Sequence, residues 1–444
     1  MAGGNYSSQS KKQPGVYINV LSQKNRPVAI GDRGIVTICK PLSWGPESAV
    51  TEIYAGDDCS TVIGYAIMAE EALFLREIFT GSDHTSPAYK VLLYRPAAEG
   101  AIAATGAIGD LFLTAKYKGI RGNDITVSVL DSGNSTFVVQ TFVSAVKKDE
   151  QEVGSIGALK SNDWVLFSGE GVLTESASMP LLGGSDGSVI TSSYADYLTA
   201  IESYSFDILI YDGNEDTVKQ AMVSFVKRMR GNTGRKCQAV IANMNADSEA
   251  AISVMNGYRL SDGTTITPEQ ATWWVGGAEA GARYNESLVY AIHPNAVDAV
   301  PRFTSVEIDA ALDRGQIVFM EEFGHVKVVS DINTLVTYTG DKDDYFALNQ
   351  VIRTVDTICN DMYREFSINY IGRVQNNEAG RDLLKGWLVG YLSEIQANGG
   401  IQEFESGDVT VSAGNAINGV VVDIAIQPVG AIEKIYVTVK LVDE

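Results

Sequence analysis

The side chains that could do acid–base or nucleophilic chemistry are few in this chain. It has three histidines, His84, His293 and His325. A serine hydrolase of the subtilase type needs an aspartate, a histidine and a serine in that order, with the serine in a Gly-Thr-Ser context. The nearest serine, Ser178, lacks the preceding Gly-Thr. We therefore predict that the protein is not an enzyme, and we interpret the histidines as ordinary surface or turn residues.

A second pattern matches a metal site only in part. Asp212, Asn214 and Asp216 have the first three spacings of a calcium-binding loop. However, Thr217 stands where that loop needs glycine, and Val223 stands where it needs a bidentate glutamate. We expect a helix N-cap at this place and predict no metal site.

A third pattern, Gly-Gly-Ser-Asp-Gly at 183–187, could be taken for a phosphate-binding loop. A P-loop continues with Lys followed by Ser or Thr, and no such pair follows here. A turn at the entry to a domain explains the glycines better. We therefore predict that the protein holds no cofactor.

The densest basic cluster has two interpretations. It consists of Lys227, Arg228, Arg230, Arg235 and Lys236. Cations at the end of a helix complement the negative end of its dipole. The same side chains could instead bind a neighbouring subunit of an acidic polymer, and both alternatives stay open.

The composition narrows the class of protein. A chain of 444 residues exceeds what one core supports, so we expect two to four domains. A net charge of −21 disfavours binding to phosphate backbones, so we predict no nucleic-acid partner. Residues 1–13 lack the apolar core of a signal peptide, and no run of about 18 apolar residues predicts insertion into a membrane. The four cysteines show no CxxC spacing, which fits a reducing cytoplasm.

The elements that must position these side chains alternate between strand and helix in most of the chain. Residues 28–96 read as the first part of an α/β region, with a helix near 62–79 and a continuous apolar strand at 90–95. Residues 182–335 repeat strand and helix, which predicts a mostly parallel, three-layer sheet. Its expected helices are 193–204, 217–229 and 268–284, and its expected strands are 207–211, 238–243 and 288–292.

The other blocks differ in pattern. Residues 97–181 hold short strands separated by Gly and Asn, which predicts an inserted small β-sandwich or barrel. Residues 336–427 hold two long helices: one follows Asp341 to Asp344 and continues to about Tyr370, and Asn376 or Asn377 caps the other, which Gly399-Gly400 ends. We predict an α+β domain there. Residues 1–27 form an N-terminal arm and linker, and 428–444 form a C-terminal arm.

The last stretch, 419–442, reads as two consecutive strands. The first places Val420, Val422, Ile424 and Ile426 on one apolar face, and a break at 428–431 follows. The second places its own apolar face on alternate residues from Ile435 to Leu441. An isolated two-stranded ribbon is marginal in water, so its faces and edges need partners. The pattern alone leaves open whether those partners lie in this chain or in another.

Together, several segments resemble the contractile tail sheath proteins of bacteriophages and phage-tail-like particles. They are the Pro14-Gly15-Val16-Tyr17 start, the Ser43-Trp44-Gly45-Pro46 turn, Gly122-Asn123-Asp124-Ile125 in the inserted domain, Leu182-Gly183-Gly184-Ser185-Asp186-Gly187, and the ending of two helices and two strands. The resemblance covers essentially the full length. It implies a subtilisin-like α/β domain, the inserted β-domain, the α+β C-terminal domain and extended arms.

The resemblance also implies a structural subunit that polymerises helically around an inner tail tube and contracts to drive that tube through a cell envelope. Family members exchange strands between subunits, and connectors at 22–27 and 428–431 would act as hinges. The implied N-terminal arm is Pro14, Gly15, Val16, Tyr17, Ile18, Asn19, Val20 and Leu21; the implied C-terminal arm is Ile435, Tyr436, Val437, Thr438, Val439, Lys440 and Leu441; and the implied acceptor strand carries Val420, Val422, Ile424 and Ile426.

The implied partners are further copies of the chain, the tube protein, and baseplate and tail terminator proteins. Candidates for the tube contact are Arg373, Arg381 and Lys385. The protein would be made in the bacterial cytoplasm and end in a virion tail or a released phage-tail-like particle. Two alternatives are a subtilase-like hydrolase, which the missing triad opposes, and an extracellular surface-array subunit, which the missing export signal opposes.

Overall fold

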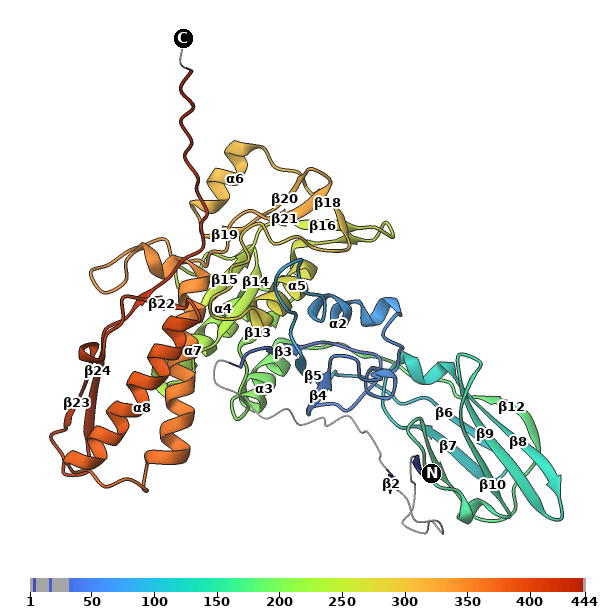
Figure 1. The fold of residues 1–444 in the computed structure, drawn as a ribbon. Helices are drawn as coiled ribbons and strands as arrows, with labels where there is room; N and C mark the ends of the chain where they lie inside the picture. The colour runs from blue at the N-terminus through green and yellow to red at the C-terminus, as the bar shows by residue number, and fades with distance from the viewer. Residues whose placement is uncertain (1–2, 5–15, 18–31, 442–444) are drawn as a thin grey trace.

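The computed structural model describes residues 3–4, 16–17 and 32–441. Of the predicted N-terminal arm, only Val16 and Tyr17 belong to this part; they form β2 (Val16–Tyr17), which pairs in parallel with β1 (Gly3–Gly4). Pro14, Gly15 and residues 18–21 lie outside the described residues. Figure 1 shows the rest as a β-rich domain, a central α/β body and a helical C-terminal part that lies on the opposite side of this body.

The central body is built on a seven-stranded sheet in the order β19-β15-β14-β13-β3-β5-β4. Only β4 runs antiparallel to its neighbour, so the predicted mostly parallel sheet is found. The strands from before and after the β-rich insertion share this one sheet. Their bounds are β3 (Ile35–Cys39), β4 (Val50–Tyr54), β5 (Lys90–Tyr94), β13 (Ile208–Tyr211), β14 (Gln238–Ala242), β15 (Ala251–Val254) and β19 (Gln316–Ile317).

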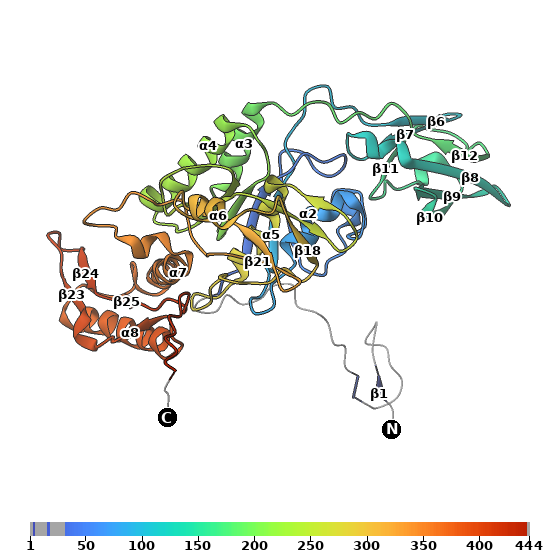
Figure 2. The same ribbon diagram turned by 90° about the horizontal axis from the view of Figure 1, so that it is seen from above.

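Helices cover both faces of this sheet. α2 (Leu73–Ile78) and α5 (Pro268–Gly281) lie on one face, and α3 (Thr191–Ile201) and α4 (Asp216–Arg228) lie on the other (Figure 2). Each face of the sheet has its own hydrophobic core, and alternate residues of a strand point into one or the other. Ile208 and Ile210 pack with α5, whereas Leu209 and Tyr211 pack with α3 and α4. Because both faces are buried, these strands read as continuous apolar runs. The predicted mixed α/β fold is confirmed, and its likeness to subtilisin stays a prediction.

Two predicted elements are wrong. The helix expected at 62–79 is split into α1 (Ser60–Ile63), a 3-10 turn η1 (Glu70–Ala72) and α2, because Gly64 takes a left-handed φ of 85° and ends the first piece. The strand expected at 288–292 is not formed. Tyr290 has a φ of +57°, which is incompatible with an extended strand, and only Ile292 makes an isolated bridge.

The inserted domain packs two antiparallel sheets, in the orders β10-β9-β8-β12 and β11-β7-β6. Its core includes Trp44 from the central body, stacked at 4.9 Å on Trp164. The edge strand β10 carries the charged run Lys147–Glu152, which discourages pairing with other chains. The strands are β6 (Thr105–Ile108), β7 (Leu111–Ala115), β8 (Ile125–Gly133), β9 (Thr136–Val143), β10 (Val146–Val153), β11 (Val165–Ser168) and β12 (Ser176–Pro180).

A smaller β-rich layer covers one end of the central body beside α5. It holds the sheet β17-β16-β18 and the hairpin of β20 and β21. The elements are β16 (Gly257–Leu260), β17 (Thr265–Ile266), β18 (Ala296–Val300), α6 (Ser305–Leu312), β20 (Phe319–Glu322) and β21 (His325–Val328).

The C-terminal part is an antiparallel helix pair backed by short strands. α7 (Asn349–Glu365) follows a 3-10 turn η5 (Asp344–Ala347), and Asn377 caps α8 (Glu378–Ala397) by accepting a 2.9 Å bond from the Gly380 amide, as predicted. The strands are β22 (Ile401–Gln402), β23 (Val409–Ala413), β24 (Val420–Ile424) and β25 (Gln427–Pro428). No helix among residues 32–441 is long and apolar enough to cross a membrane.

Candidate assembly surface and domain junctions

The end of the chain is an unpaired apolar segment. Residues 432–441 run away from the body (Figure 1), and none of them pairs with a strand in the described part of the chain. The exposed fractions are 79% for Ile435, 76% for Val437, 80% for Val439 and 95% for Leu441. The two consecutive strands predicted for 419–442 therefore do not form one ribbon. The first of them is β24, which pairs with the preceding strand β23. The second has no partner strand in the described part of the chain.

β23 and β24 form a hairpin in which Val409 faces Ile424, Val411 faces Val422 and Ala413 faces Val420. One face packs on α8, where Val422 and Ile424 are half-buried against the helix core. Within residues 32–441 no strand covers the outer edge of either β23 or β24. Of the predicted acceptor residues, Ile426 lies beyond the strand but packs on the same core. β23 was missed, although Val409 and Val411 alternate with polar residues.

The residues that precede the exposed part of the C-terminal arm, here called its root, are hydrogen-bonded to the body of the protein. β25 pairs with β22, the Val429 amide donates to the Gly400 carbonyl at 3.1 Å, and the Ala431 amide donates to Gln350 Oε1 at 2.8 Å. The predicted hinge at 428–431 is hydrogen-bonded in this structure to α7 and to the end of α8, and its role in contraction stays a prediction. The first residue without such a contact is Ile432, which is 84% exposed.

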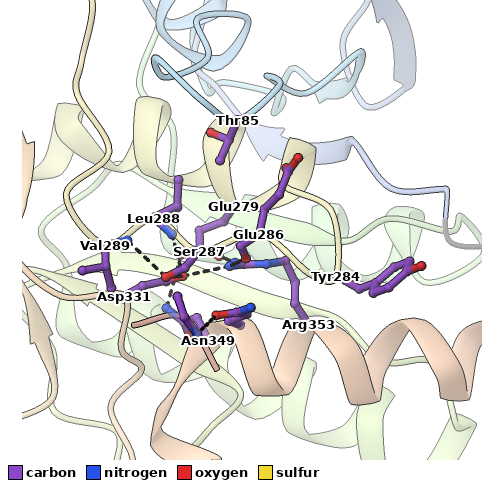
Figure 3. Close-up of polar contacts among 12 residues, drawn as sticks. Thr85, Glu279, Tyr284, Glu286, Ser287, Leu288, Val289, Asp331, Asn349 and Arg353 are labelled. Atoms are coloured by element: carbon purple, nitrogen blue, oxygen red, sulfur yellow. Dashed lines mark hydrogen bonds and ion pairs between the residues drawn. The ribbon is translucent and has the colours of Figure 1, made fainter. Parts of the chain in front are cut away.

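A buried ion cluster holds α7 on the central body (Figure 3). The Arg353 guanidinium on α7 donates to Asp331 Oδ2 at 2.8 Å and to the Glu286 carbonyl at 2.8 Å, and it pairs with Glu279 of α5. All three charged side chains are at most 1% exposed. Asn349 donates to the other oxygen of Glu279 at 3.2 Å.

Two carboxyl groups share the Arg353 guanidinium, and their pKa values are shifted in opposite directions. Burial and the neighbouring Asp331 raise the pKa of Glu279 well above its usual range, which favours its protonated form. Burial acts to raise the pKa of Asp331 as well, but the Arg353 charge outweighs it and holds this pKa below its usual value. The cluster fixes α7, and with it the arm root, relative to the central sheet.

Most side chains of the predicted basic cluster form hydrogen bonds or ion pairs with other residues of the same chain. Arg230 donates to Asp356 of α7 at 2.8 Å and forms a second tie between the two parts of the molecule. Arg228 makes two 2.8 Å bonds to Glu202, Arg235 donates to the Glu202 carbonyl at 2.7 Å, and Lys236 donates to the Arg230 carbonyl at 3.0 Å. Lys227 and Arg228 also lie in the last turn of α4, as the helix interpretation predicts.

Three of the motifs that suggested the family meet at the root of the inserted domain. Asp186 accepts hydrogen bonds from Ser43 at 3.0 Å and from the Ile120 amide at 2.8 Å. Asn123 and Gly184 exchange bonds of 3.0 and 2.8 Å. The glycine-rich run at 183–187 is therefore a structural turn that attaches the β-sandwich, in agreement with the interpretation as a domain entry.

Among the described residues, no histidine ring makes a hydrogen bond to a serine hydroxyl. His293 is only 1% exposed, so its assignment to the surface is wrong: its Nε2 lies 2.9 Å from Glu77 Oε2 in the core. Burial and Glu77 raise the pKa of Tyr258 well above its usual range, so this phenol stays protonated and donates to the same carboxyl. His84 contacts Asp83 and the Ser287 carbonyl.

Asp212, from the partial calcium-binding pattern, makes contacts inside the protein. Asp212 pairs with Lys40 and accepts a 2.9 Å bond from the Trp273 indole. The predicted side-chain N-cap is wrong, because α4 begins at Asp216 after Glu215 without a capping hydrogen bond. Residues 32–441 hold no group of three His, Cys, Asp or Glu side chains that could bind a metal ion.

The three candidates for a tube contact, Arg373, Arg381 and Lys385, lie in the connection between α7 and α8 and at the start of α8. Arg373 is exposed in the connection, while Arg381 and Lys385 are half-buried in the first turns of α8. Arg381 donates to Asn376 at 3.0 Å, and Asn376 in turn donates to the Ile417 and Gly419 carbonyls. The structure thus gathers these residues at one end of the helix pair, next to the β23–β24 loop.

A mixed α/β body, an attached β-sandwich and an unpaired apolar C-terminal segment are typical of a structural subunit that binds further chains. Family models match the phage tail sheath protein beta-sandwich domain at residues 99–186, the central domain at 187–334 and the C-terminal domain at 341–442. The Bacillus subtilis phage-like element PBSX protein XkdK is 33% identical over 99% of this chain and 100% of its own length. The chain belongs to the phage tail sheath protein family.

Solved structures agree with this assignment. The crystal structure of a sheath tail protein from Desulfitobacterium hafniense has a TM-score of 0.84 and 41% identity, and the match covers 95% of this chain and 99% of that one. The contracted helical sheath of the anti-feeding prophage has a TM-score of 0.57 at 11% identity over 96% of this chain and 98% of that one, which shows a shared fold. The family is one of structural tail sheath proteins, and the predicted resemblance is confirmed.

Proposed function

We propose that this chain is the subunit of a contractile tail sheath that polymerises helically around an inner tail tube and contracts to drive the tube through a target envelope. The observation that carries the proposal is the exposed run from Ile435 to Leu441, which has apolar residues at alternate positions. This run follows the hydrogen-bonded root, and the β23–β24 hairpin has edges that no strand of the described chain covers. A free strand and an open sheet edge in the same chain fit each other between copies. Such a head-to-tail contact does not close on itself and so produces a helix.

In this proposal Ile435, Tyr436, Val437, Thr438, Val439, Lys440 and Leu441 add a strand to the β23–β24 hairpin of a neighbour, and residues 14–21 act as a second exchanged arm. Main-chain hydrogen bonds supply binding, and the alternation of side chains fixes the register. Since Ala431 is hydrogen-bonded to Gln350, rotation between subunits during contraction requires either release of this bond in the hinge at 428–431 or rotation about residues 432–434.

The remaining parts of the proposal concern partners and location. The tube is contacted through Arg373, Arg381 and Lys385, and the two ends of the sheath bind baseplate and tail terminator proteins. The subunit is made in the bacterial cytoplasm and ends in a virion tail or a released phage-tail-like particle. The subtilisin likeness of the central body belongs to the proposal as well.

The test is electron microscopy of purified full-length protein and of two truncations, one without residues 1–21 and one without residues 435–444. The full chain should form hollow helical tubes, and each truncation should stay folded by circular dichroism but remain monomeric. Sheaths of normal length from either truncation would reject the role of that arm. Isolated particles from the full chain would favour the hydrolase, and flat lattices would favour the surface array.

A further inference from the structure

A groove of about 720 Å³ opens at the root of the C-terminal arm. Its wall combines half-buried aliphatic side chains with tyrosines that are 51 to 62% exposed. Representative lining residues are Ile332, Val336, Tyr290, Tyr338, Tyr345 and Lys434. Since Lys434 is part of the arm, the groove lies where the chain leaves the body.

Tyr290 lines the groove and, together with Lys327 and Phe323, forms a set of three residues beside it that we call the rim. Tyr290 and Phe323 have φ values of +57° and +55°, and their exposed fractions are 52% and 86%. A bulky side chain in the left-handed region is rare and costs conformational energy. The Lys327 ammonium lies 4.9 Å from the Tyr290 ring centre and 5.5 Å from that of Phe323. The fold thus holds two exposed aromatic rings around Lys327, whose ammonium also pairs with Glu322 at 2.7 Å.

The arm restricts what can lie over this surface. The chain is fixed as far as Ala431, and residues 432–441 reach at most about 33 Å from it, at roughly 3.3 Å per extended residue. Any molecule that takes up this arm must therefore lie close to Lys434. Figure 1 shows the β20–β21 hairpin and the arm on the same side of the molecule.

We infer that the groove, together with the Tyr290–Lys327–Phe323 rim, is a docking surface for a second copy of this chain, namely the copy that receives the arm. This inference rests on the proposed function. It adds a contact between folded bodies to the exchanged strand. A short tether raises the local concentration of the second copy to the millimolar range, so even a weak groove contact is occupied.

The chemistry of the groove fits an apolar protein surface better than an anionic ligand. Asp313, Asp344 and Glu433 line it together with Lys434, so acidic groups outnumber the basic one. Solvent-exposed aromatic and aliphatic side chains that lie together are typical of protein contacts.

The first test is hydroxyl-radical footprinting of the full-length chain, as monomer and as assembled tubes. Oxidation of Tyr338 and Tyr345 should fall at least five-fold on assembly, while oxidation of Phe112, 56% exposed on the β-sandwich, should change little. Equal oxidation of the groove tyrosines in monomer and tube would overturn the inference. Protection already present in the monomer and lost on removal of residues 435–444 would assign the groove to the chain's own arm, which also overturns it.

The second test compares Tyr338→Asp with the matched surface variant Phe112→Asp. Both should fold with the melting temperature of the parent, because both side chains are more than half exposed. The concentration needed for tube formation should rise at least ten-fold for Tyr338→Asp only. Normal assembly of this variant would contradict the inference, and footprinting of the unmodified chain decides the question if the variant misfolds. Failure of the proposed function is distinguishable, because then the unmodified chain forms no tubes.

Discussion

Arg353 and Asp331 form a 2.8 Å ion pair in which neither side chain is more than 1% exposed. Arg353 is on α7, and Asp331 lies on the segment that leads from the central body to the C-terminal part. The same guanidinium pairs with Glu279 of α5. Rigid attachment of α7 matters for assembly, because the arm root is hydrogen-bonded to α7 through Gln350.

Replacing Arg353 by leucine should destabilise the fold by about 3–5 kcal/mol, because Asp331 would remain as a buried charge without its partner. The free energy of unfolding from denaturant titration measures the change. Arg228→Leu removes an exposed pair with Glu202 and should have little effect. Equal effects of the two variants would contradict the role assigned to the buried cluster.

The raised pKa of Glu279 predicts a dependence of stability on pH. Between the ordinary glutamate pKa of about 4.3 and the raised value in the fold, the folded chain keeps a proton that the unfolded chain has lost. The contribution of Glu279 is therefore fully present below the ordinary pKa and is lost as the pH rises through the folded pKa. Glu279→Gln, which imitates the protonated acid, should lose less stability than the parent between pH 5 and pH 8. Parallel pH profiles for the two proteins would show that Glu279 is ionised in the fold.

Gly119 should tolerate no side chain. It has φ 128° and ψ 163°, a region that is almost limited to glycine, and a Cβ would lie 2.1 Å from the Ser43 carbonyl oxygen. Gly119→Ala should cost at least about 2 kcal/mol more than Gly100→Ala, because Gly100 also has a positive φ but has no atom within 4 Å of its Cβ position. Calorimetry measures the stabilities. Similar melting temperatures for the two variants would mean that the junction can relax.

The two faces of the C-terminal arm should differ in their response to substitution. If the arm adds a strand to a half-buried hairpin, one set of alternating side chains packs and the other faces water. Val437→Asp should raise the concentration needed for tube formation at least ten-fold, whereas Thr438→Asp should change it by less than three-fold. Sedimentation of assembled tubes measures this concentration. If both variants behave alike, the arm does not bind as a regular strand.

Reversal of charge at the proposed tube contact should affect co-assembly with the tube protein but not formation of the sheath polymer alone. Arg373→Glu combined with Lys385→Glu should weaken co-assembly with the tube protein at least ten-fold, while the sheath polymer still forms alone. The variant avoids Arg381, which supports the Asn376 loop. Glu378→Lys, at the exposed start of α8, adds positive charge nearby and serves as the matched control. Unchanged co-assembly of the double variant would reject this site.

Local pattern predicted the elements of the central sheet well. The continuous apolar runs at 90–95 and 207–211 became β5 and β13, because strands buried on both faces need apolar side chains at every position. The pattern was less informative where a single backbone angle decides, as at Gly64 and Tyr290, since hydrophobic periodicity does not report a left-handed φ. His293 was misassigned because a turn sequence gives no information about what later packs over it.

The sequence by itself determined the alternation of strand and helix, the inserted β-sandwich, the apolar alternation of the C-terminal arm and the membership of the family. Only the tertiary structure decided which partner each strand takes, and so showed that Val420–Ile424 pairs with β23 and leaves 435–441 free. It also brought Arg353 to Glu279 and Asp331, 74 and 22 residues away in the chain. The physical reason is that periodicity specifies which face of an element is buried, whereas pairing and ion contacts depend on distances between segments that the sequence separates.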